Sequence, residues 1–529
     1  MVRHRSVIGW GIGVEALVVG IGRCGGLMHV LQLLTMKAPF VVVSVQTSNA
    51  PNHSDARSVL ADQQLVTGPL PLTPLEQFLL QCATPRSPMV IRVVLRLTGE
   101  CQPDLYVQTL QRAIERHPML SCRLQKINRQ WCWVSGTPEP IVISRRSGSV
   151  FDLESGLVSK FIDLTQSAGL HTSIVVLDDG VKVFMDVHHA ATDGNGMRQV
   201  ITDWFHLYHC EVTSTPSKLP VVDPDRLVHR HVFPQPASIP PISLKQSLIN
   251  IWATIRGRTS RWAVAEQRAG QQLDATSSHC VEIILSDAQG NQLRERMAAW
   301  NVKLNDLAMV CLMSTYAKLA PPGSNQHRVT VLNPIDLRMP SDRSLPATNR
   351  FGIAFMRRPR AECLNPVAIL RGIHDEMTYV RSNYVGVEFV KGLVTASKMP
   401  GGIDLFRRLG FFIPSMQWTC LGDVSRGGKR LIPWKDGMPI SGNLQLATAT
   451  GFAPCADNVP MSIATCEANR KITLTVRSSP RFLTMDDTQK FADTLVHSLC
   501  TFELPDGFCH VARHNAVSDS GATNEDASG

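Results

Sequence analysis

Two adjacent histidines give the strongest chemical signal in the sequence. Residues 184–187 have the pattern of a strand, which ends in His188 and His189, and Asp193 and Gly194 follow after a short segment. Histidine suits a general base because its ordinary pKa lies close to neutral pH. Asp193 is near enough to brace the turn, and Gly194 allows a tight backbone where the next helix begins. The spacing therefore predicts a site at a strand end, where a neutral imidazole meets a substrate.

Two other interpretations of the histidine pair stay open at this point. Buried histidines often serve only the packing of a core. A metal site needs more ligands than this pair supplies, and no third convincing ligand is visible nearby. The remaining histidine pairs also lack partners at metal spacing and are expected in loops or on the surface: His206 with His209, and His229 with His231. We therefore predict no metal, and the sequence assigns no cofactor-binding residue.

The segment 188–194 resembles the H-H-x-x-x-D-G motif of the chloramphenicol-acetyltransferase-like superfamily. That superfamily includes condensation domains of nonribosomal peptide synthetases, alcohol acetyltransferases, polyketide-associated acyltransferases and wax ester synthase/diacylglycerol acyltransferases. Five further segments resemble the family in the same order along the chain: 71–76, 105–123, 163–170, 333–338 and 349–352. The resemblance spans roughly residues 70 to 505, and motifs in a shared order are more specific than one motif alone.

The resemblance implies roles for the motif residues. His189 would be the base that takes a proton from an acceptor hydroxyl or amine, which then attacks a thioester carried by coenzyme A or a phosphopantetheine arm. Asp193 would point away from substrate and pair with Arg338, which makes both structural. His188 would shape the turn, and Gly194 would give the substrate room. No cofactor would be tightly bound, and no covalent enzyme intermediate would be required.

Two departures from the family limit what the resemblance implies. The D-F-G-W-G segment of plant relatives is missing from the sequence, which argues against that branch. Several lipid-type relatives carry a Ser-Asn pair before a late glycine, where this chain has the stretch 417–423. The donor that would stabilise an oxyanion is therefore not assigned.

The elements around the motif alternate between strands and helices. Thr73 is expected to cap a helix that begins at Pro74. Further predictions in the first half are a strand at 90–97, a helix at 103–116, a strand pair at 173–177 and 181–187, and a helix at 194–208. In the second half they are strands at 281–285, 328–332 and 472–476 and helices at 287–300, 304–319, 361–382 and 486–499. The stretch 400–455 allows no assignment.

A chain of 529 residues exceeds one hydrophobic core, so two lobes are expected. The predicted fold class is α/β (α+β mixed sheets), with two chloramphenicol-acetyltransferase-like lobes and an active-site tunnel between them. An N-terminal extension over residues 1–68 is interpreted as disordered or as a wrongly assigned start. The expected lobes cover 69–212 and 280–510, with a linker or crossover over 213–279 and a disordered tail over 511–529.

Composition argues against several other classes of protein, such as nucleic-acid-binding and membrane-anchored proteins. Lys+Arg 53 against Asp+Glu 44 gives a net charge of +9, which is too diffuse to indicate nucleic-acid binding. The 14 cysteines include no C-x-x-C pair and favour reduced thiols in a cytoplasmic protein. The apolar run at 7–22 contains Glu15, so a membrane anchor is not favoured.

The expected function is an acyltransferase that moves an acyl group from acyl-CoA or an acyl-carrier protein to an alcohol. Two alternatives stay open: a stand-alone enzyme that forms amides with an amine acceptor, as nonribosomal condensation does, and a non-catalytic module of the same fold that binds a carrier protein. Fold alone does not decide among them.

Overall fold

The computed structural model describes residues 68–151, 160–233, 259–260, 262, 278–320, 327–408, 413–424, 431–435 and 437–504. The predictions for residues 1–67 and for the tail at 511–529 lie outside these described residues, as does much of the expected linker.

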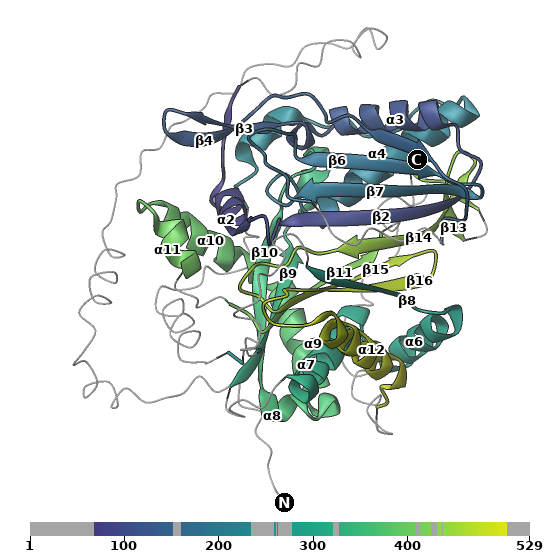
Figure 1. The fold of residues 1–529 in the computed structure, drawn as a ribbon. Coiled ribbons are helices and arrows are strands. Elements are labelled where there is room, and N and C mark those ends of the chain that lie inside the picture. The colour runs from purple at the N-terminus through teal and green to yellow at the C-terminus, as the bar shows by residue number, and fades with distance from the viewer. Residues whose placement is uncertain are drawn as a thin grey trace, which may run out of the picture. The chain divides into compact units, whose positions relative to one another are not determined.

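A seven-stranded sheet carries the histidine motif (Figure 1). In spatial order its strands are β12 (Trp434–Lys435), β13 (Met438–Ser441), β14 (Leu444–Phe452), β2 (Val90–Gly99), β7 (Gly180–His188), β6 (Leu170–Val176) and β5 (Val142–Arg145). Neighbouring strands run antiparallel except β5 and β6, which are parallel. Most residues of β2 and β7 are buried, as expected of central strands.

Two helices pack on this sheet and on each other, namely α3 (Pro103–Glu115) and α4 (Gly194–Thr213). Trp204 of α4 donates its ring N–H to the Tyr106 carbonyl of α3 over 3.0 Å, and the two rings lie 4.3 Å apart. Both side chains belong to the same core as the strands β2 and β7. The buried polar tip of the tryptophan is thus satisfied, and α4 is fixed on the sheet behind the motif.

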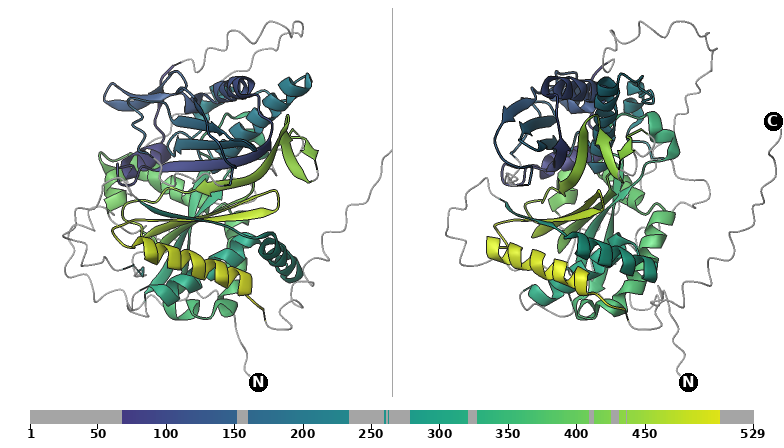
Figure 2. Two further views of the ribbon diagram at one scale, coloured as in Figure 1. Left: turned by 45° about the vertical axis from the view of Figure 1, so that its right-hand side comes forward. Right: turned by 90° about the vertical axis from the view of Figure 1, so that its right-hand side faces the viewer.

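A six-stranded sheet forms the second lobe, with its own hydrophobic core (Figures 1 and 2). Its strands in order are β10 (Phe351–Pro359), β9 (Arg328–Asp336), β11 (Met416–Asp423), β15 (Met461–Ala468), β16 (Lys471–Ser478) and β8 (His279–Ile284). Four helices lie along one side of it: α6 (Asp287–Trp300), α7 (Leu304–Leu319), α9 (Pro366–Ser382) and α12 (Met485–Thr501). Helix α7 is buried along almost its whole length, so it forms the centre of this layer.

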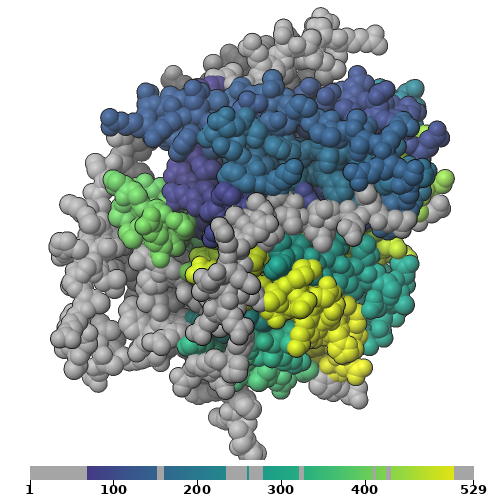
Figure 3. All heavy atoms as spheres, viewed as in Figure 1, coloured from purple at the N-terminus to yellow at the C-terminus, as the bar shows by residue number. Residues whose placement is uncertain are grey.

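Smaller elements complete the side of the molecule next to the motif. A three-stranded sheet joins β1 (Leu70–Pro71), β4 (Gln130–Val134) and β3 (Arg123–Ile127). Helix α2 (Pro74–Cys82) begins in a capping box, in which Thr73 accepts from the Glu76 N–H and Glu76 accepts from the Thr73 N–H. Helices α10 (Gly386–Ser397) and α11 (Gly402–Arg408) lie beside α2 (Figure 3), where Phe389 stacks edge-on against Phe78.

The chain crosses from the second lobe into the first. Strand β14 lies in sequence between β11 and β15 of the six-stranded sheet, yet it pairs with β2 along nearly its whole length. It also contacts the second sheet, because Thr473 and Thr475 of β16 donate their hydroxyls to the Ala449 and Gly451 carbonyls over 2.9 and 2.8 Å. The boundaries of the lobes, 69–212 and 280–510, remain a prediction. Strands β12–β14 lie in the second of these ranges by sequence but pair in the sheet of the first.

Most predicted elements are confirmed: α2 begins at Pro74, α6 and α7 have the predicted bounds, and α3, α4 and α12 have shifted ends. The single helix predicted at 361–382 is wrong, because the chain forms the short helix α8 (Arg360–Cys363) and then α9, which begins at Pro366. Proline has no N–H to continue a helix, and Asn365 caps the new one through the Ala368 N–H. Strands β1 and β10–β15 and helices α10 and α11 were not predicted.

The cysteines and the helices bear on two further predictions. The 12 cysteines among the described residues are free thiols. Burial raises the pKa of several of them, for example Cys363 to about 12, so they stay protonated. None of the helices in the described ranges is both long and apolar enough to cross a bilayer.

Candidate active site

The turn after β7 is fixed by its neighbouring strands. The His188 N–H donates to the Gly169 carbonyl over 2.9 Å, and the His189 N–H donates to the Met89 carbonyl over 2.8 Å. The His188 ring is buried and accepts a hydrogen bond from the Ala190 N–H at Nδ1 over 3.1 Å. Burial, and secondly the neighbouring His189, lower the pKa of His188 to about 3. A neutral His188 therefore holds the turn from within.

Asp193 connects the turn to helix α4 and to the second lobe. Its carboxylate caps α4 by accepting from the Gly196 N–H over 2.8 Å. It also accepts two hydrogen bonds from Arg338, at 3.0 and 2.8 Å, and one from the Arg350 N–H at 2.8 Å. Burial alone would raise the pKa of Asp193, but Arg338 and these two backbone N–H groups hold it below its ordinary value. The ion pair that the family resemblance implied is thus present.

Asn349 holds the backbone of the motif from the other side. Its side-chain amide donates to the His189 carbonyl over 2.8 Å and to the Ala190 carbonyl over 2.9 Å. Arg338 also donates to the Thr348 carbonyl over 2.8 Å, which keeps the segment before β10 against the turn. Sequence reasoning gave Asn349 no role, although the segment 349–352 had already been singled out by its likeness to the family.

The His189 ring has a defined tautomer in this setting. Its Nδ1 lies 3.2 Å from the Thr192 carbonyl oxygen, which can only accept, so Nδ1 carries the proton and Nε2 has a free lone pair. The ring stacks on Phe351 at 5.1 Å between centroids, which fixes its plane. Burial lowers the pKa of His189, and this effect is opposed by the negative charge of Asp193 and by the hydrogen bond that the ring donates to the Thr192 carbonyl. The imidazole is therefore neutral and able to accept a proton near pH 7.

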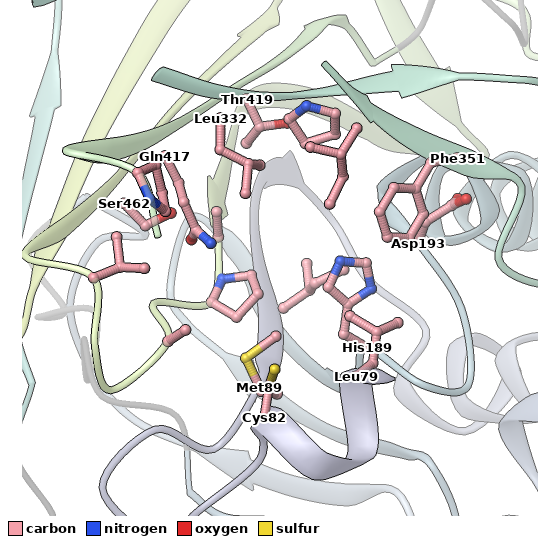
Figure 4. Close-up of a pocket in the computed structure, with 18 of the residues that line it drawn as sticks. Leu79, Cys82, Met89, His189, Asp193, Leu332, Phe351, Gln417, Thr419 and Ser462 are labelled. Atoms are coloured by element: carbon pink, nitrogen blue, oxygen red, sulfur yellow. The ribbon is translucent and has the colours of Figure 1, made fainter. Parts of the chain in front are cut away.

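His189 faces a cavity of about 400 Å³ between the two sheets (Figure 4). This volume lies in the range of small-molecule sites. Apolar side chains from both lobes form most of the wall: Phe78, Leu79, Met89, Ile91, Leu332, Phe351 and Ile353. Apolar walls strengthen electrostatic interactions inside a site and disfavour water.

The space beside Gly194 is filled by Leu421. A side-chain carbon added to Gly194 would lie 2.7 Å from one methyl of Leu421, and one added to Gly451 would lie 2.6 Å from the other. Strand β11 has an irregular register between Cys420 and Asp423, with Gly422 at a φ of +60°. The irregularity brings Leu421 between the two glycines, where it forms part of the cavity wall.

His206 and His209 both lie on helix α4, and His206 is buried there, so the expectation of a loop or surface position is wrong for His206. His206 bonds the Leu431 carbonyl through Nδ1 over 2.7 Å and accepts from the Lys218 N–H at Nε2 over 3.0 Å. His209 accepts from the Gly442 N–H over 3.3 Å. Among the residues that the structure describes, no three His, Cys, Asp or Glu side chains gather closely enough to hold a metal ion.

The motif residues thus form one site, with His188, His189, Asp193, Gly194 and Arg338 brought together from β7, α4 and the segment after β9. A neutral imidazole in the position of His189 can accept a proton from a hydroxyl or amine that enters the cavity. Sequence reasoning missed the wall of Gln417, Thr419 and Ser462, because no element was assigned at 400–455 and β15 was not predicted.

A scan against protein-family models finds no match, and a search of curated proteins finds none. Solved structures do match. The trichothecene 15-O-acetyltransferase from Fusarium sporotrichioides has 12% identity and a TM-score of 0.58 over 82% of this chain and 95% of that chain. The starter condensation domain of rhizomide synthetase, in complex with C8-CoA and Leu-SNAC, has 13% identity and a TM-score of 0.56 over 82% and 94%.

The epimerization domain from the third module of tyrocidine synthetase B has 15% identity and a TM-score of 0.55, over 83% of this chain and 99% of that chain. These structures differ in the reactions that their names describe, but they share two lobes built on mixed sheets. The chain therefore shares the two-lobed α/β fold of these epimerization, condensation and acetyltransferase structures, and the predicted fold class is confirmed.

Proposed function

We propose that this protein is an acyltransferase that moves an acyl group from a thioester to an alcohol, with His189 as the general base. One observation carries the proposal. His189 is a neutral imidazole with Nδ1 bound to the Thr192 carbonyl, and it lines an apolar cavity between the lobes. A base with one nitrogen anchored and the other free is the arrangement that proton transfer requires.

The steps follow from this geometry. The acceptor O–H gives its proton to His189 Nε2 as its oxygen attacks the thioester carbonyl carbon. The tetrahedral intermediate then collapses, the C–S bond breaks, and the leaving sulfur takes the proton from Nε2. The products are an ester and a free thiol, and His189 returns to its starting state. Asp193 takes no part in proton transfer, because its carboxylate is occupied by Arg338, Arg350 and Gly196.

Acyl-CoA is the proposed donor, and an acyl-carrier protein is the alternative. The rhizomide starter condensation domain is described in complex with C8-CoA, and it shares this fold. The apolar walls of the cavity suit an acyl chain, whose transfer from water is favourable. No cofactor beyond the thioester itself is needed for the reaction.

Release of free thiol tests the proposal. The full-length protein is mixed with acyl-CoA species of graded chain length and with a panel of alcohols and amines, and thiol and acylated product are measured together. Ester formation that His189→Ala abolishes would support the proposal. Amide formation would favour the condensation alternative, and binding of donor without turnover by the wild type would favour the non-catalytic module.

We also propose a cytoplasmic location, which the unpaired cysteines favour. Fractionation of cells that express the full-length protein tests this location. Recovery of the protein in the membrane pellet, from which detergent releases it, would contradict a cytoplasmic location.

A further inference from the structure

Three uncharged polar side chains lie next to one another in the wall of the cavity, most of which is apolar. Gln417 and Thr419 lie two residues apart on β11, so they share one face of the sheet. Ser462 on β15 is the direct neighbour of Gln417 across the parallel pair. All three line the cavity, and Figure 4 shows Gln417 and Ser462 on its other side from His189.

None of these three side chains has a hydrogen-bond partner among the described residues. The Ser462 hydroxyl is the clearest case, since the residue is only 2% exposed and its Oγ is unpartnered. Hydroxyls on the adjacent strand β16 are satisfied, as Thr473 and Thr475 donate to carbonyls of β14 and Ser478 bonds Thr488. A buried polar group without a partner destabilises a protein unless a ligand or water satisfies it.

We propose that Gln417 and Ser462, with Thr419 beside them, form a polar subsite that binds a neutral hydrogen-bonding group of the substrate. The group is a hydroxyl, carbonyl or amide, because a glutamine amide and two hydroxyls both donate and accept but carry no charge. An apolar segment of the substrate separates it from the reacting atom, because apolar residues such as Met89 and Leu332 line the cavity along with the subsite.

The subsite gives the proposed acyltransferase a basis for selecting substrates. A site built to hydrogen-bond a substrate group rejects analogues that lack it, since its own polar groups then stay unpaired. The polar group can belong to the acyl chain or to the acceptor. The distinction between acyl chain and acceptor rests on the proposed function. The binding of a polar ligand in this cavity does not require turnover.

Binding is therefore measured by calorimetry in the His189→Ala background, where no probe is consumed. One arm compares octanoyl-CoA with 8-hydroxyoctanoyl-CoA, and the other compares 1-octanol with 1,8-octanediol. We expect the hydroxylated member of at least one pair to bind about tenfold more tightly, which corresponds to one or two net hydrogen bonds. The arm that shows the preference identifies whether the acyl chain or the acceptor reaches the subsite.

Gln417→Leu and Ser462→Ala should each bring that ratio close to one while leaving the affinity for the apolar member unchanged or higher. Gln445→Leu is the matched control, because Gln445 is a half-buried glutamine on β14 that does not line the cavity. Equal affinity within both pairs, or a ratio that survives Gln417→Leu and Ser462→Ala, would overturn the polar subsite. A wild type that transfers no acyl group would instead overturn the proposed function, whatever these ratios are.

Discussion

Arg338 and Asp193 meet in a two-pronged ion pair that joins the second lobe to the histidine motif of the first. Arg338 Nη1 lies 3.0 Å from Asp193 Oδ2, and Nη2 lies 2.8 Å from Oδ1. A fork of two parallel hydrogen bonds fixes both position and orientation. The first residue of α4 and the turn that holds His189 are therefore set by a contact between residues 145 positions apart.

Breaking this pair should cost stability as well as activity. Asp193→Ala leaves the Arg338 guanidinium without its main partner, and we expect the free energy of unfolding to fall by about 3 to 5 kcal/mol. Chemical denaturation of the purified protein measures the change. The double variant Asp193→Ala/Arg338→Ala should recover part of the loss, because neither charge is then stranded. Strictly additive effects of the two substitutions would mean that the pair is not coupled.

Removal of the proposed base should affect rate far more than folding. His189→Ala should lower kcat by about 10² to 10⁴, the usual contribution of a general base. In the wild type the rate should rise with pH as the imidazole loses its proton. Because burial lowers the pKa of His189, that rise should lie below the ordinary histidine range. Unchanged turnover in the variant, measured by thiol release, would remove the mechanism.

Asn349 is expected to position His189 rather than to react. Asn349→Ala removes the donor to two carbonyls of the motif, and the loss of each bond should cost about 1 to 3 kcal/mol of stability. Asn349 also raises the pKa of His189, because its amide oxygen can accept from the protonated ring. The pH–rate profile of the variant should therefore shift to lower pH, a change that a purely structural role would not produce. An unshifted profile would limit Asn349 to structural support.

His188 should make the protein sensitive to acid. Its pKa is about 3 in the folded protein, against an ordinary histidine value in the unfolded chain, so the unfolded state binds the proton first. The stability from a neutral His188 is complete above the unfolded pKa and falls as pH decreases toward 3. His188→Asn keeps an acceptor for the Ala190 N–H without a titrating ring. Acid denaturation followed by circular dichroism should show a lower midpoint pH for this variant, and an equal midpoint would contradict the account.

Gly194 and Leu421 should be coupled through the space that they share. Gly194→Ala would place a methyl group 2.7 Å from the Leu421 side chain, so we expect a loss of stability of about 1 to 3 kcal/mol. Leu421→Ala removes the clash, and the double variant should be more stable than the sum of the two single changes predicts. Thermal unfolding of the four proteins measures the coupling. Gly392→Ala serves as a control for the added methyl group, since Gly392 lies in helix α10 and a side-chain carbon there would meet its nearest neighbour, Phe406, at 3.8 Å.

Elements with local signals could be predicted from the residues alone. Thr73 and Pro74 defined the start of α2, and the spacing of apolar residues defined α6 and α7 with the same bounds as in the structure. The motif from His188 to Gly194 lies within one short stretch, so the position of the proposed base could be predicted without a fold. The ion pair between Asp193 and Arg338 could be predicted only because a family resemblance linked two distant segments.

The surroundings of the proposed base depend on long-range contacts in the folded chain. The pairing of β14 with β2 joins residues more than 300 positions apart, and nothing in either strand encodes its partner. The stretch 400–455 could not be assigned because β11 is irregular and β12 and β13 are short, which leaves too few residues for a periodic pattern. The walls of the cavity come from both sheets and from α2. The side chains that share the cavity with His189 include Gln417, Ser462 and Leu421. Their position there depends on the order of strands that lie far apart in the sequence, which cannot be predicted from one sequence.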